Sequence, residues 1–124
     1  MRVVDSSAWI EWLTQGPAAD QLQDKMPART ECIVPTIVQL ELAKWLERER
    51  DEDAVDSFFA YTATCIVVPL DTALARRAAE VSARHKLALA DAIIYATADL
   101  YDADVLTLDA HFKNLDRVAY FSKE

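Results

Sequence analysis

The amino-acid sequence predicts an α/β fold with a largely parallel β-sheet. Short β-rich apolar runs alternate along the chain with longer segments of helical periodicity, as expected for strands joined by crossover helices. With 124 residues, of which 52% are hydrophobic, the chain is long enough to bury one core and too short for a second domain. We therefore expect a single domain over residues 1–124.

The individual strands and helices follow from local patterns. Strands are expected where short apolar runs are bounded by polar or turn-forming residues, at 2–4, 32–34, 66–68, 104–107 and, more weakly, 118–120. Gly16 and Pro17 end the first helix, and Pro35 suits the first turn of the third. The predicted helices are 7–14, 18–26, 35–50, 52–63, 71–86 and 89–101.

Composition and charge exclude several classes of function. Gly16 is the only glycine, so neither a P-loop nor a glycine-rich dinucleotide loop exists. The net charge of −8 argues against broad nonspecific binding to nucleic acid, which is driven by Lys and Arg. A bound divalent cation would offset part of this charge locally, and an acidic surface suits a basic protein partner.

The remaining features indicate an ordinary cytoplasmic protein. A charged residue, Arg2, precedes any possible signal-peptide core, and no apolar stretch approaches the length of a membrane span. The cytoplasm is therefore the expected compartment. Cys32 and Cys65 lack the spacing of redox or zinc motifs and are expected to be buried free thiols.

Four acidic residues stand in apolar surroundings and are the candidate site residues: Asp5, Glu41, Asp91 and Asp109. Asp5 and Asp109 each follow a predicted strand, and parallel strands bring their carboxyl ends to one rim of the sheet. Two carboxylates about 4 Å apart repel by roughly 4 kcal/mol at an effective dielectric near 20. If the acids converge, they require a cation such as Mg²⁺ or Mn²⁺, and such a site suits phosphodiester hydrolysis.

Each of these acids also has an ordinary structural explanation. Asp5 and Asp109 precede helical turns and could be N-caps. Asp91 has apolar helical neighbours and must cap, pair or bind metal, because a buried unpartnered carboxylate is costly. Glu41 is followed at helical spacing by cations and could form a surface ion pair. No zinc site is expected at His111, which lacks a paired-histidine spacing.

The order and spacing of these motifs resemble those of PIN-domain ribonucleases and, more narrowly, VapC-type toxins of toxin–antitoxin pairs. The resemblance covers essentially the whole chain and rests on Val3-Val4-Asp5-Ser6-Ser7, on Thr36 with Glu41, and on residues 87–98 and 106–112. It implies a three-layer α/β/α sandwich around a parallel sheet. One departure is that residues 101–104 lack a glycine often found there.

The resemblance also implies a function and a set of partners. Asp5, Glu41, Asp91 and Asp109 match the family's acidic quartet, which implies a Mg²⁺- or Mn²⁺-dependent endoribonuclease acting on RNA. Thr107 matches a threonine that gives a supporting contact. The implied partner is a small antitoxin whose C-terminal segment wraps the toxin and directs a basic residue toward the acids. A toxin homodimer is also implied.

The four acids are expected to have different roles in metal binding. Asp5, Asp91 and Asp109 hold the principal ion, and Glu41 ligates a second ion or orients water, with the general base left unassigned. Two alternatives from other classes remain. One is an inactive PIN-like module that only binds a protein, and the other is a receiver-like phosphoacceptor domain.

Overall fold

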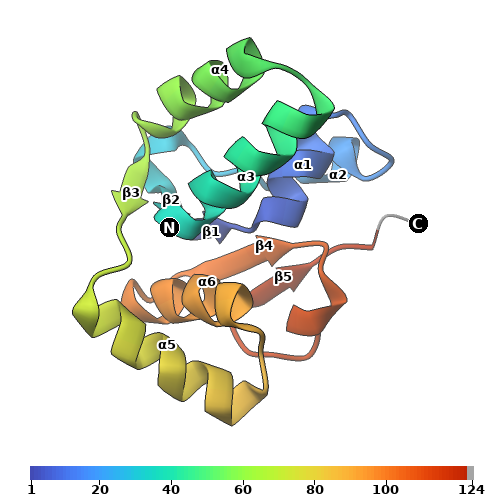
Figure 1. The fold of residues 1–124 in the computed structure, drawn as a ribbon. Helices are drawn as coiled ribbons and strands as arrows, with labels where there is room; N and C mark the ends of the chain where they lie inside the picture. Colours follow the sequence, from blue (N-terminus) through green and yellow to red (C-terminus); the bar gives the residue numbers. More distant parts are fainter. Residues whose placement is uncertain (123–124) are drawn as a thin grey trace.

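The computed structural model, which describes residues 1–122, contains one parallel sheet with the strand order β3-β2-β1-β4-β5 (Figure 1). Every neighbouring pair of strands is parallel, as predicted. The strands are β1 (Arg2–Val4), β2 (Cys32–Pro35), β3 (Ile66–Val68), β4 (Asp104–Thr107) and β5 (Val118–Tyr120). All five lie where the sequence placed them.

Within residues 1–122, six α-helices and two short 3-10 helices connect the strands. They are α1 (Ser6–Leu13), α2 (Ala19–Gln23), η1 (Arg29–Glu31), α3 (Thr36–Glu49), α4 (Glu52–Thr62), α5 (Thr72–His85), α6 (Leu89–Leu100) and η2 (Ala110–Phe112). Only the predicted helix 18–26 differs clearly, because it ends at Gln23. Turns replace its last residues ahead of Pro27, which disfavours helical geometry at the residue before it.

The helices form two layers on either side of the sheet. Figure 1 shows α1 to α4 on one side and α5 with α6 on the other. Right-handed crossovers explain this, because the chain moves outward from β1 to β3 and then returns across the sheet to β4. The fold is thus a three-layer α/β/α sandwich. The strand order reverses between β1 and β4, which is where open α/β sheets bind their ligands.

The core lies on both faces of the central strands. Val3, Val4, Ile33 and Leu106 are completely buried, as expected for parallel strands covered by helices on both sides. Both cysteines are free thiols, as expected, but only Cys32 is buried as predicted, because Cys65 is half-buried. Within residues 1–122, no helix has the length and apolar character needed to cross a membrane.

A buried carboxylate fixes the turn after α1. Glu11 is only 4% exposed, and its Oε2 accepts a 2.7 Å hydrogen bond from the backbone N–H of Ala18. Gly16 lies directly beside this carboxylate, and a Cβ atom at position 16 would overlap it. The one glycine of the chain is therefore explained by the space that Glu11 occupies.

We predict that Gly16→Ala lowers the free energy of unfolding by about 1–3 kcal/mol, because the added methyl group displaces Glu11 from its buried hydrogen bond. Urea denaturation measures this loss. In a Glu11→Ala background the same substitution should cost distinctly less, since the obstructing carboxylate is gone. Additive losses in the double variant would show that the contact is not the cause.

Candidate metal centre

The candidate acids lie at the carboxyl edge of the sheet, around the point where the strand order reverses. Asp5 follows β1 directly and Asp109 follows β4 after one residue. The Asp5 N–H donates to the carbonyl of Leu106 at 2.9 Å, so the β1–β4 pairing continues into the site. Glu41 lies on α3 and Asp91 in the first turn of α6, so both helical layers contribute.

Two hydroxyl groups hold the Asp5 side chain in place. Its Oδ2 accepts hydrogen bonds of 2.7 Å from Ser7 Oγ and from Thr107 Oγ1. The carboxylate is buried, yet it makes no capping bond to α1, although Asp5 occupies the N-cap position. The N-cap explanation for Asp5 is therefore wrong. Its carboxylate instead links the end of β1 to the end of β4.

The same hydroxyls also position the segment that carries Asp109. Ser7 Oγ accepts from the N–H of Leu108 at 3.0 Å, and Thr107 Oγ1 accepts from the N–H of Asp109 at 2.9 Å. Thr107 is completely buried, so its hydroxyl is shielded from competing water. The supporting role that the resemblance assigned to Thr107 is thus visible as contacts with two of the candidate acids.

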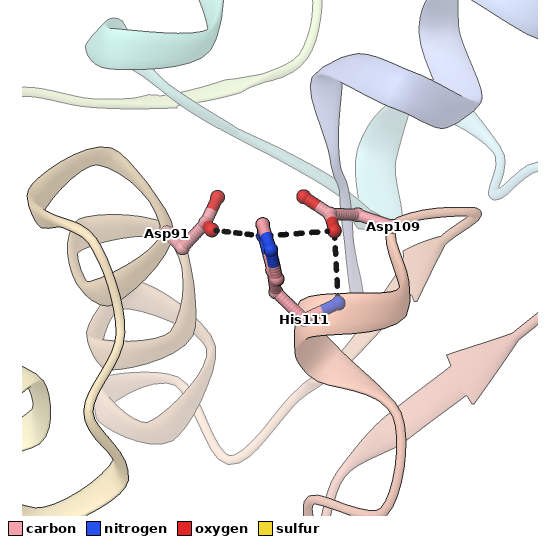
Figure 2. A group of neighbouring side chains, drawn as sticks. All are labelled: Asp91, Asp109 and His111. Atoms are coloured by element: carbon pink, nitrogen blue, oxygen red, sulfur yellow. Dashed lines mark hydrogen bonds and ion pairs between the residues drawn. The ribbon is translucent and has the colours of Figure 1, made fainter.

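Asp91 and Asp109 face each other across the imidazole of His111. Figure 2 shows the ring between the two carboxylates, with its Nδ1 3.6 Å from Asp91 Oδ2 and 3.2 Å from Asp109 Oδ1. The three side chains offer ligand atoms that all lie within 4.8 Å of one another. Asp109 Oδ1 also accepts from the His111 N–H at 2.9 Å, so the N-cap explanation is confirmed for Asp109.

Glu41 is held at the edge of this group by the first residue of α1. Its Oε1 accepts a 2.7 Å hydrogen bond from Ser6 Oγ. Among residues 1–122, Glu41 forms no ion pair with Lys44 or Arg48, and Arg48 pairs with Glu49 instead. The surface-pair explanation for Glu41 is therefore wrong.

The electrostatics show that the four acids form one interacting cluster. Burial raises the pKa of Asp91 to about 6, and repulsion from Asp109 and Asp5 adds to the shift while His111 opposes it. Burial also raises the pKa of Asp5 and of Glu41, and repulsion from Asp109 adds to both shifts. Without a cation, the cluster therefore carries an unfavourable concentration of negative charge.

The site divides into an inner group and two adjoining acids. Asp91, Asp109 and His111 lie close enough together to share one ion. In the described part of the chain, no equally tight group of three includes Asp5 or Glu41, each of which has one carboxylate oxygen bonded to a hydroxyl group. The predicted acids therefore gather in one region, but they are not equivalent in position.

Sequence reasoning missed some of the side chains that build the site. Ser6 and Ser7 were explained by the start of the helix, yet their hydroxyls bind Glu41 and Asp5. His111 was considered only as a zinc ligand. Its position two residues after Asp109, inside a turn that Asp109 caps, was the signal for its proximity to the acids.

Comparisons with known proteins agree with this architecture. The solved structures that resemble the chain include a toxin–antitoxin complex from Klebsiella pneumoniae, with a TM-score of 0.84, 19% identity and coverage of 98% of this chain and 99% of that one. Mycobacterium tuberculosis VapC20, described as a toxin that cleaves the sarcin-ricin loop, has a TM-score of 0.78 and 20% identity, covering 95% and 97% of the two chains. FitAcB from Neisseria gonorrhoeae has a TM-score of 0.69 and 20% identity, covering 99% and 98%.

At the level of sequence, the evidence comes from a family model. A search of curated proteins finds no significant match. The model of the PIN domain, in contrast, matches residues 2–118, which is nearly the whole chain. Together with the parallel sheet and the acids at its carboxyl edge, this match shows that the chain belongs to the PIN domain family.

Proposed function

We propose that this protein is an endoribonuclease that uses Mg²⁺ or Mn²⁺ to hydrolyse RNA phosphodiester bonds, and that it acts in the cytoplasm as the toxin of a toxin–antitoxin pair. The observation that carries the proposal is the gathering of Asp5, Glu41, Asp91 and Asp109 into one electrostatically coupled cluster. Membership of the PIN family and the similarity to a toxin described as cleaving the sarcin-ricin loop support it.

The residues present fit a divalent metal ion. Asp91 and Asp109 supply hard oxygen donors within 4.8 Å of each other, which is the ligand type that Mg²⁺ and Mn²⁺ accept. The raised pKa of Asp91 shows that negative charge is disfavoured there in the absence of a cation. When bound, such an ion offsets charge on the phosphate and lowers the pKa of a water molecule.

The chain's own residues would divide the work. Asp91 and Asp109 hold the ion, and Asp5 completes its negative environment from the buried end of β1. Glu41, fixed by Ser6, is placed to orient the attacking water or to hold a second ion. Ser7 and Thr107 position Asp5 and Asp109 without contacting substrate, because their hydroxyls are used within the network.

The proposed partner is an antitoxin with a basic segment. One similar structure is described as a toxin–antitoxin complex, and three others are described as VapBC, VapBC2 and FitAB bound to DNA. On this chain, an apolar cavity of about 360 Å³ between α1, α3 and α4 is lined by the aromatic rings of Trp9, Trp12, Phe58 and Tyr61. Apolar and aromatic surfaces of this kind suit a protein contact.

We also propose that residues 1–124 act as one domain and that the toxin forms a homodimer.

Of the two alternatives, one is wrong and one remains to be tested. A receiver-like phosphoacceptor domain has the strand order 2-1-3-4-5, whereas the order here is 3-2-1-4-5. An inactive PIN-like module that only binds a protein has the same fold as the proposed nuclease. Metal binding and RNA cleavage separate these two functions.

We predict that Asp91→Asn reduces Mg²⁺- or Mn²⁺-dependent cleavage of RNA to the level of a protein-free control, because it removes a ligand charge while preserving the side-chain shape. Cleavage is followed on gels with highly purified protein. Asp99→Asn, on the same helix but paired with Arg77 at the surface, is the matched control and should retain activity. Full activity of the Asp91→Asn protein would refute the assignment.

We predict that Mn²⁺ raises the melting temperature of the wild-type protein. A ligand at about 100 times its Kd stabilises the folded state by about 2.7 kcal/mol, which corresponds to several degrees for a domain of this size. Differential scanning fluorimetry measures the shift. Asp91→Asn should lose most of it, whereas a binding module without a metal site would show no shift even in the wild type.

We predict that the metal-free protein loses stability as the pH rises from about 4 to about 6. The pKa of Asp91 is raised from 3.8 to about 6, so the folded state binds more protons than the unfolded state in this window, and stability falls with increasing pH. Asp91→Asn removes this contribution and should gain about 1–2 kcal/mol relative to wild type at pH 7. Urea denaturation in EDTA gives the free energy of unfolding of both proteins. If the difference between Asp91→Asn and the wild type is the same at pH 4 and at pH 7, the prediction is wrong.

A further inference from the structure

His111 is the one side chain of the inner group that the acidic quartet does not include. Among residues 1–122, it is the only basic side chain within 4 Å of Asp91 or Asp109. Its imidazole is 75% exposed, so it does not fill the core. The backbone N–H of His111 bonds to Asp109 and holds the 3-10 turn, and this bond does not depend on where the ring lies. Neither core packing nor the turn therefore explains the position of the ring.

The spacing of the three donors fits the coordination sphere of a single ion. Two ligand atoms about 2.1 Å from an octahedral ion, at right angles to each other, lie about 3.0 Å apart. The separations of His111 Nδ1 from the carboxylates are 3.2 Å and 3.6 Å, close to this edge length. Only small side-chain movements are needed to bring all three donors onto one ion. Figure 2 shows that the two carboxylates approach the ring from different elements, α6 and the segment after β4.

We infer that His111 Nδ1 is a ligand of the metal ion and that it biases this site toward Mn²⁺ over Mg²⁺. This inference rests on the proposed metal-dependent function and deepens it. Imidazole nitrogen binds first-row transition metals well, whereas Mg²⁺ is bound almost entirely by oxygen. Replacing one carboxylate or water oxygen by nitrogen therefore weakens Mg²⁺ relative to Mn²⁺. Oxygen donors alone would not create this preference.

The first test measures affinity for each ion. His111→Gln should weaken Mn²⁺ binding about 10- to 100-fold, the range seen when metal-site partners are removed. Mg²⁺ binding should weaken much less, so that the ratio of the two dissociation constants falls. Isothermal titration of metal-free protein gives both constants. His85→Gln is the matched control, because His85 packs against the Tyr95 ring instead of the acids and should leave the ratio unchanged.

The second test detects the nitrogen ligand directly. Pulsed electron paramagnetic resonance of the Mn²⁺-loaded protein should show coupling to a directly bound nitrogen in the wild type and in His85→Gln. This coupling should be absent in His111→Gln. The variant should fold normally, since the side chain is largely exposed, and circular dichroism checks this.

The outcomes distinguish this inference from the proposed function. If Asp91→Asn abolishes Mn²⁺ binding while His111→Gln keeps both the nitrogen coupling and the selectivity ratio, the metal site stands and His111 is not a ligand. Equal weakening of both ions without a nitrogen signal in the wild type also overturns the inference. If the wild type shows no saturable binding of either ion, the proposed metal dependence itself fails.

Discussion

Repulsion among like charges at the junction of β1 and β4 is the constraint on which the site depends. Asp5 and Asp109 are brought together by the parallel pairing of the two strands. Their coexistence requires compensation, and the described structure supplies part of it through the hydroxyls of Ser7 and Thr107. Both hydroxyls donate to the Asp5 carboxylate and accept from the backbone N–H groups of Leu108 and Asp109, so they fix both acids without cancelling their charge, and an attraction for cations is retained.

The acids come from both helical layers, so a bound ion connects separate parts of the fold. Glu41 reaches the site from α3 on one face of the sheet, and Asp91 from α6 on the other. An ion held by Asp91 and Asp109 therefore joins α6 to the end of β4. In the proposed function, the ion would reinforce the packing of a whole layer as well as serve the chemistry. This is why thermal stability is an informative readout of binding at this site.

The strands and the region of the site could be predicted because both follow from local rules. Apolar runs locate the strands, and parallel topology then forces Asp5 and Asp109 to one edge. The apolar neighbours of Asp91 indicated a partner, although not which one. The contacts between Ser6 and Glu41, and between His111 and Asp91, join residues far apart in sequence and depend on helix packing angles. The left-handed residue Asp102 (φ 52°) shows a further limit, because the segment lacking the expected glycine forms its turn with an aspartate.

The charge of the cluster also links the proposed ion to the proposed partner. Any cation that reaches Asp91 and Asp109 relieves the same repulsion, whether it is a metal ion or a basic side chain of an antitoxin. Two cations that are attracted by the same carboxylates compete for them, and each lowers the affinity of the other by the same factor. A partner that inserts a basic group here would therefore disfavour the metal-bound state as well as block access to RNA. The net charge of −8 would favour the approach of such a partner from a distance. Apolar contacts with the half-buried rings of Trp12 and Tyr61 would then distinguish it from other cations.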